Sequence, residues 1–199
     1  MQTSVVTPER FAKGITYEQW MAAIAEDRNK PRFQENYDET AISEDDTRAL
    51  RDLVARPDGP ARCLALGEPW CPDVFRGLPV MARIAEASGI ELRCFFRDQN
   101  NDIMSEFLHH GEHESIPTLV FYTRDHRYIA HWIERPELAN EEMPQLRELT
   151  APLRNPDLSP EEREQYIKAY VEFQHGPVWG GWRDATVREI RELLEAQLG

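Results

Sequence analysis

Residues 61–74 read ARCLALGEPWCPDV, and this stretch decides the fold. Its first six residues form a short apolar run that is typical of a buried strand, and Gly-Glu-Pro at 67–69 ends it. Pro72 is then well placed as the first residue of a helix, where its missing N–H is not needed. Apolar residues recur at helical spacing from there to Gly89, a natural helix end. The stretch therefore predicts a strand, a tight loop and a helix, with a kink at Pro79.

Three further strands are predicted after this helix, at Leu92–Phe96, Thr118–Tyr122 and Arg127–Ile133. A helix that opens at Asn101 or Asp102 and runs to Gly111 separates the first of them from the other two. The strand at 61–66 and the next strand should be parallel, because a helix connects them in a right-handed crossover. The last two should form an antiparallel hairpin. The pattern predicts an α/β fold, a mixed sheet with helices on it.

Helical segments flank this central part on both sides. Before it, the spacing of Thr16 and Gln19 fits a capping box, and Ser43 is a predicted helix N-cap. After it, Ser159 and Pro160 predict the start of another helix. We expect a loop at 175–182 whose two tryptophans pack the last helices on the sheet rather than bind a partner.

We divide the chain into an N-terminal helical extension (1–59), a core (60–135) and a C-terminal helical extension (136–199), within one compact domain. The first boundary is the turn sequence Arg-Pro-Asp-Gly-Pro at 56–60.

Charge and hydropathy argue against two classes of partner, nucleic acids and membranes. The formal net charge of −13 argues against binding nucleic acid, which needs a basic patch. No apolar run is long enough to span a bilayer, so no membrane contact is expected. The first ten residues do not resemble a secretory signal, and we therefore expect a cytoplasmic protein whose three cysteines are reduced.

Two motifs carry a resemblance to a known family. The first is Trp70-Cys71-Pro72-Asp73-Val74 at a strand-to-helix junction, and the second is Ile116-Pro117-Thr118 just before a strand. With Asp-Gln-Asn at 98–100 and the order of the strands, they resemble the thioredoxin family, and most of all bacterial thioredoxin-like proteins whose motif reads Trp-Cys-Gly-Asp-Cys. The resemblance implies a thioredoxin-like mixed sheet over residues 60–135 and a cis peptide bond before Pro117, which would face Cys71.

The chain departs from the family at three positions. Val74 replaces the second motif cysteine, which resolves mixed disulfides in the family, so the usual cycle within the motif is impossible. Ala65 stands where the family has a buried acid, and Cys94 lies near the position of the lysine that often pairs with that acid. Small apolar side chains thus replace a buried ion pair.

The chemistry of Cys71 depends on two opposing effects. Backbone N–H groups and the dipole at a helix N-terminus stabilise a thiolate, whereas the neighbouring carboxylate of Asp73 disfavours it. The sequence leaves the sign of the pKa shift open. Cys71 is either a nucleophile or a relic on a scaffold used for binding, and we favour the nucleophile.

We therefore predict a monothiol, thioredoxin-like redox protein without a cofactor, in which Cys71 forms mixed disulfides. Its partners would be a protein disulfide or a low-molecular-weight thiol such as glutathione, which would release the mixed disulfide. Substrate would contact a surface consisting of Trp70, Pro72, Asp73, Ile116 and Pro117, with the backbone at Ile116 pairing with an extended peptide. The alternative is a redox-inactive module that binds a protein or peptide, as a monomer or a homodimer. A third and weaker alternative is a thiol that reduces peroxide.

Other candidate residues are weaker. Cys63 and Cys94 lie in apolar strands, where cysteines usually act as small hydrophobic residues, and Cys94 is the less unfavourable partner for Cys71. His109, His110 and His113 cluster before the second motif. A metal site or a catalytic base is conceivable there, but no matching ligands accompany them, so we predict no metal and interpret the cluster as a solvated helix end.

Overall fold

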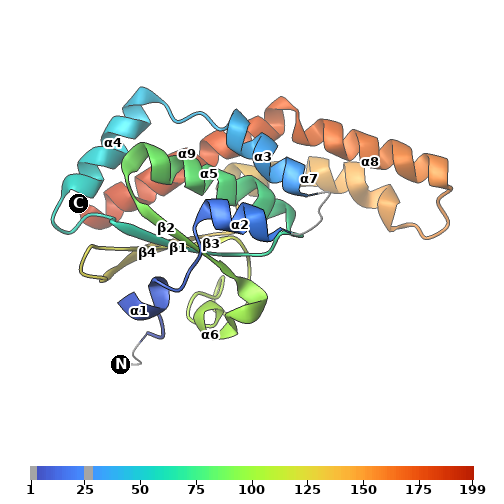
Figure 1. Ribbon diagram of the computed structural model, residues 1–199. Coiled ribbons are helices and arrows are strands. Elements are labelled where there is room, and N and C mark those ends of the chain that lie inside the picture. Colours follow the sequence, from blue (N-terminus) through green and yellow to red (C-terminus); the bar gives the residue numbers. More distant parts are fainter. Residues whose placement is uncertain (1–3, 25–28) are drawn as a thin grey trace.

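The computed structural model describes residues 4–24 and 29–199. Four strands form one sheet in the order β2-β1-β3-β4, with helices on both faces (Figure 1). They are β1 (Arg62–Gly67), β2 (Glu91–Phe96), β3 (Thr118–Tyr122) and β4 (Tyr128–Ile133). β1 pairs in parallel with β2 and antiparallel with β3, and β3 pairs antiparallel with β4. The predicted mixed sheet is confirmed.

Helix α5 (Pro72–Ser88) is the longest element that packs on the centre of the sheet, and it starts directly after Cys71. Its apolar stripe is buried, including Leu78, Met81 and Ile84. Gly89 ends it with a left-handed φ of 89°, a conformation that glycine adopts without strain. The predicted helix is confirmed, and Pro79 lies inside it.

The N-terminal extension contributes four helices to the described residues: α1 (Pro8–Phe11), α2 (Tyr17–Ala23), α3 (Lys30–Glu39) and α4 (Glu44–Ala55). Thr16 and Gln19 form the predicted capping box, and Ser43 caps α4 as expected. Trp20 on α2 is fully buried and stacks on Phe96 with ring centroids 4.4 Å apart. The extension therefore belongs to the same core as the sheet.

The predicted helix up to Gly111 is wrong. A short 3-10 turn, η1 (Arg97–Gln99), leads into α6 (Asn101–Met104), which has only four residues. Beyond it the chain turns back, since His110 has φ 53° and the N–H of His109 bonds to the carbonyl of His113 at 2.8 Å. The histidine cluster thus lies in a turn rather than at a helix end.

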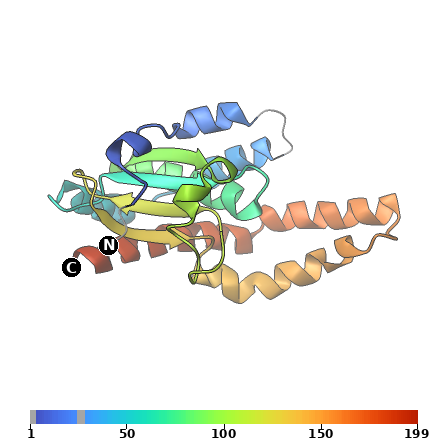
Figure 2. The ribbon, with the colours of Figure 1, turned by 90° about the horizontal axis from the view of Figure 1, so that it is seen from below.

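The C-terminal extension consists of α7 (Glu137–Thr150), η2 (Ala151–Arg154), α8 (Pro160–Gln174) and α9 (Pro177–Leu198). α7 and α8 form an arm that projects well beyond the sheet (Figures 1 and 2), whereas α9 packs on α5 and β4. At the tip of the arm, Arg163 donates hydrogen bonds to the carbonyls of Leu153 and Asn155. The predicted capping box at Ser159 begins α8.

The predicted loop at 175–182 is wrong as well. Gly176 is a helix N-cap and Pro177 is the first residue of α9, so both tryptophans lie on a helix. Trp179 and Trp182 are buried, and the indole of Trp179 donates to the side-chain carbonyl of Asn36 at 3.0 Å. The interpretation of these tryptophans as packing residues is confirmed. None of the described helices is both long and apolar enough to cross a membrane.

Candidate functional site

The site lies where the loop after β1 meets the loop before β3. Cys71 is the N-cap of α5, with extended backbone angles. Its thiol donates a long hydrogen bond, 3.8 Å, to the carbonyl oxygen of Ile116. The Ile116–Pro117 peptide bond is cis, as predicted. The structure therefore brings together the two motifs that lie 45 residues apart in the sequence.

Gly77 explains how closely the second loop approaches the helix. A Cβ atom on Gly77 would lie 3.0 Å from Cγ of Pro117, tighter than an ordinary van der Waals contact. Pro117 therefore packs directly on the backbone of α5, one and a half turns from its start. This packing fixes the distance between the thiol and the carbonyl of Ile116.

The backbone of Ile116 has unused hydrogen-bonding capacity. Its side chain is buried, but within the described part of the chain its N–H has no partner, and its carbonyl receives only the weak thiol contact. An extended peptide laid along this residue would satisfy both groups, as an added strand does.

The thiol of Cys71 is half-buried, and its surroundings determine the direction of its pKa shift, which the sequence left open. Burial raises the pKa of Cys71, and the charge of Asp73 raises it further. The backbone N–H groups of Val74 and Asp73 and the charge of Arg135 lower it, but by less in sum. At neutral pH the protonated thiol therefore predominates.

Asp73 is held between two arginines. One carboxylate oxygen lies 3.0 Å from Nη2 of Arg76, and the other lies 2.7 Å from Nη2 of Arg135. Arg135 also pairs with Glu134, whose carboxylate lies 3.3 Å from Nδ1 of His109. A chain of charges thus runs from α5 to the turn that carries the histidines.

Arg76 is fully buried, which is unusual for a charged side chain. Its guanidinium lies against the rings of Trp179 and Trp182, 5.4 and 5.5 Å from their centroids. Its Nε and Nη1 atoms have no hydrogen-bond partner among residues 4–24 and 29–199. Burial lowers the pKa of Arg76, and the charge of Asp73 opposes that shift. Asp73 is therefore the carboxylate that balances a cation inside the protein.

Trp70 and Arg97 form the exposed side of the site. Trp70 is 57% exposed, and the guanidinium of Arg97 lies 5.9 Å from the centroid of one of its rings. Arg97 is itself paired with Glu114 at 2.8 Å. The indole therefore offers a broad contact surface beside the thiol.

A buried acid that the sequence analysis missed lies three residues before the cysteine. The carboxylate of Glu68 accepts the N–H of Asp98 at 2.8 Å, and its backbone carbonyl accepts the N–H of Cys71. Burial raises the pKa of Glu68. At the family's own acid position, Ala65 pairs with Cys94 in the β1–β2 register, and both are buried.

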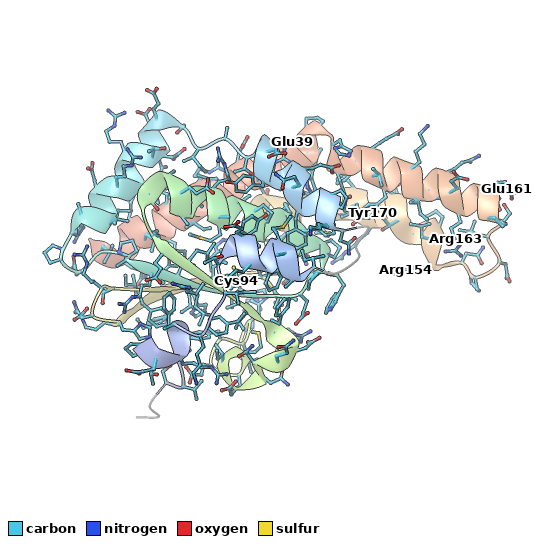
Figure 3. The ribbon with its side chains drawn as sticks, viewed as in Figure 1. Glu39, Cys94, Arg154, Glu161, Arg163 and Tyr170 are labelled. Atoms are coloured by element: carbon cyan, nitrogen blue, oxygen red, sulfur yellow. The ribbon has the colours of Figure 1, made fainter. Side chains whose placement is uncertain are left out.

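The other cysteines are poor partners for Cys71. All three cysteines are free, and Cys63 and Cys94 are buried within the sheet, where burial raises the pKa of both thiols. Cys94 lies on β2 and forms an isolated bridge with Ile15 on the side of α2, where Figure 3 labels it. Val74, at the position of the resolving cysteine, is fully buried.

The arm meets α3 at its base. Tyr170 lies where α8 passes α3 (Figure 3), and the guanidinium of Arg32 lies 5.6 Å from its ring centroid. Burial raises the pKa of Tyr170, whereas the charge of Arg32 lowers it. The base of the arm is therefore joined to α3 through this pair.

Metal binding has no support in this region. His109 stacks on His110, with ring centroids 4.1 Å apart, and approaches the hydroxyl of Ser115 at 3.4 Å. In the part of the chain that the structure describes, no three His, Cys, Asp or Glu residues are grouped so that they could hold a metal ion.

The chain matches known proteins in family and in fold. The thioredoxin family profile matches residues 14–148, more than half of the chain. The chain belongs to the thioredoxin family. No curated protein sequence matches it.

Two solved structures share the fold over nearly the whole length, helical extensions included. A protein of unknown function, PA1234 from Pseudomonas aeruginosa, superposes with a TM-score of 0.68 at 16% identity, and the match covers 98% of this chain and 99% of that one. An HIV epitope-scaffold superposes with a TM-score of 0.65 at 18% identity, with the same coverage. This thioredoxin-family chain therefore shares its extensions, and not only its sheet, with known folds.

Proposed function

We propose that this thioredoxin-family protein carries out thiol–disulfide exchange with a single cysteine, Cys71, on an extended segment bound beside Ile116. One observation carries the proposal: the thiol lies at the N-terminus of α5, 3.8 Å from the carbonyl oxygen of Ile116, and the N–H of Ile116 has no partner among the described residues. A peptide that pairs with Ile116 would place its own sulfur next to that of Cys71.

The reaction needs no second cysteine in the protein. The Cys71 thiolate attacks one sulfur of a substrate disulfide, so that a mixed disulfide forms and the other sulfur leaves as a thiolate that takes up a proton. An external thiolate, such as that of glutathione, then attacks the substrate sulfur and releases Cys71. The net result is exchange of one substrate thiol for the external thiol, with no change in the number of disulfides.

The raised pKa of Cys71 limits the rate of thiol–disulfide exchange. At neutral pH only a small fraction of the thiol is ionised, so the exchange should be slow and should accelerate with pH. The N–H of Val74 and the charge of Arg135 provide the stabilisation that remains for the thiolate.

The same raised pKa favours a second candidate, a module that binds an extended peptide without thiol chemistry. Exposed Trp70 and the unpaired N–H of Ile116 would serve it equally well. The two candidates differ only in whether the sulfur of Cys71 reacts.

A peptide carrying a cysteine disulfide-linked to thionitrobenzoate tests both candidates, since attack releases a coloured thiolate. We expect release at a rate that grows about tenfold per pH unit below the thiol pKa, with a mixed disulfide at Cys71 identified by mass spectrometry. The Cys71→Ser variant should release nothing. Peptide that binds wild type and Cys71→Ser equally, with no release up to pH 9, would refute exchange and leave the binding module.

A further inference from the structure

A pocket on the other side of the sheet from α5 and α9 takes no part in the thiol site. It has a volume of about 330 Å³, within the range of small-molecule sites. α1 and α6 lie on this side of the sheet (Figure 1). Its walls are predominantly aromatic, with one carboxylate, and the residues that matter below are Glu106, Phe107, Tyr122, His126, Tyr128 and His131.

Three aromatic rings, those of Phe107, Tyr122 and Tyr128, line the pocket. Phe107 and Tyr128 stack with centroids 6.4 Å apart, and Tyr122 meets Tyr128 edge to face at the same distance. Tyr128 is 53% exposed, so its ring forms the rim, whereas Tyr122 is buried deep in the wall. One face of the Tyr122 ring stacks on His126, with centroids 4.5 Å apart. Cations are attracted to ring faces, and the exposed ring of Tyr128 offers such a face to the pocket.

The two histidines use their ring nitrogens in hydrogen bonds within the protein. His126 donates from Nε2 to the carbonyl of Val6 and accepts at Nδ1 from Arg62. Nδ1 of His131 lies 2.7 Å from the hydroxyl of Tyr128, and burial lowers the pKa of His131. Glu106 is the one carboxylate among the described residues that line the pocket, and no lysine or arginine is among them.

The polar groups of the pocket could accept hydrogen bonds from a ligand. Each carboxylate oxygen of Glu106 accepts one hydrogen bond at 2.6 Å, from Ser4 and from the N–H of Val5, which leaves further lone pairs free. The hydroxyl of Tyr122 is buried and has no partner in the described parts of the chain. Burial raises the pKa of Tyr122, and the negative charge of Glu106 raises it further. A ligand with N–H groups and a positive charge would satisfy the carboxylate and the hydroxyl together.

We infer that this pocket binds a small organic ammonium ion, with its cationic head between Glu106 and Tyr122 and its apolar body against Phe107 and Tyr128. The inference is independent of the chemistry proposed for Cys71, because no residue is shared between the two sites.

The test compares two probes of nearly equal shape, benzylammonium and neutral benzyl alcohol. The full-length protein, labelled with ¹³C in its aromatic side chains, is titrated with each probe at pH 7.5 and followed by NMR. We expect benzylammonium to shift the Tyr122 and Tyr128 resonances and to bind at least about fivefold more tightly than the alcohol. Equal affinity for the two probes, or shifts confined to other residues, would overturn the inference.

Variants locate the source of the preference. Glu106→Gln keeps the shape but removes the charge, and it should bring the two probes to within about twofold of each other. Glu164→Gln, an exposed position on α8, is the matched control and should change nothing. If Glu106→Gln loosens the N-terminal segment, Tyr122→Phe, which removes only the unpaired hydroxyl, replaces it and should weaken benzylammonium alone. A preference that survives both variants would refute the assignment.

A further titration separates two sources of the ammonium group. A short peptide with one lysine that binds more tightly than benzylammonium would identify a protein side chain as the ligand. Tighter binding of benzylammonium would identify a free amine.

Discussion

Replacing Asp73 with asparagine should expose how much the buried cation of Arg76 depends on one carboxylate. Arg76 is completely buried, two of its three nitrogens have no hydrogen-bond partner within the described ranges, and Asp73 lies 3.0 Å from the third. Removing one partner of a buried pair typically costs about 3–5 kcal/mol, because the other charge remains in the interior. The side chain of Asp73 is 14% exposed, so we expect the lower end of that range, about 3 kcal/mol.

The matched variant removes the cation instead. Arg76→Met leaves an apolar side chain between the two tryptophans, and Asp73 keeps its pair with Arg135, so we expect a change within about 1 kcal/mol. The double variant Asp73→Asn with Arg76→Met should recover most of the loss of the first. Urea unfolding followed by circular dichroism gives all four free energies. A loss below about 1 kcal/mol for Asp73→Asn, or no recovery in the double variant, would refute the argument.

Three further substitutions test the account. Gly77→Ala would place a Cβ 3.0 Å from Pro117, and we expect a net loss of about 1 kcal/mol in urea unfolding, since overpacking outweighs the helix propensity gained; a stabilised variant would contradict that contact. Glu68 has a folded-state pKa raised by burial, so wild-type stability falls as pH rises through it, and Glu68→Gln, which still accepts from Asp98, should gain stability relative to wild type between pH 4 and pH 7. A constant difference across that range would count against a buried carboxyl. Trp70→Ala should leave stability within about 0.5 kcal/mol but slow the release from the thionitrobenzoate peptide, and an unchanged rate would remove Trp70 from the binding surface.

Local signals accounted for much of the fold. The strand before Cys71, the helix from Pro72 and the capping boxes at Thr16 and Ser159 depend on residues close in sequence, and each is confirmed. The two failures have different causes. The helix predicted to run to Gly111 ends at Met104, because the chain turns back at His110 and Gly111, both with positive φ. The glycines of 175–182 were interpreted as a loop, although one of them begins a helix. Gly176 is an N-cap whose following proline opens α9.

The site was predictable only where a motif marked it. Cys71 and Pro117 were placed through their motifs, whereas Arg76 and Arg135 reach the site through tertiary packing, which no local pattern reveals. The ion pair of Arg76 with Asp73 could have been predicted, because Arg76 follows Asp73 by three residues on a helix and side chains at that spacing are neighbours. The pKa direction of Cys71 was undecidable because it depends on burial, which the sequence does not fix.

The pH dependence of alkylation of Cys71 tests the central claim most directly. Iodoacetamide is applied to the native protein from pH 6 to pH 10, and mass spectrometry separates modification of Cys71 from that of buried Cys63 and Cys94. We expect Cys71 alone to be modified, at a rate that rises with pH to a midpoint above the ordinary thiol pKa of about 8.5. A Cys71 that stays unmodified at pH 10 while the unfolded protein reacts, or one that titrates well below 8.5, would contradict it.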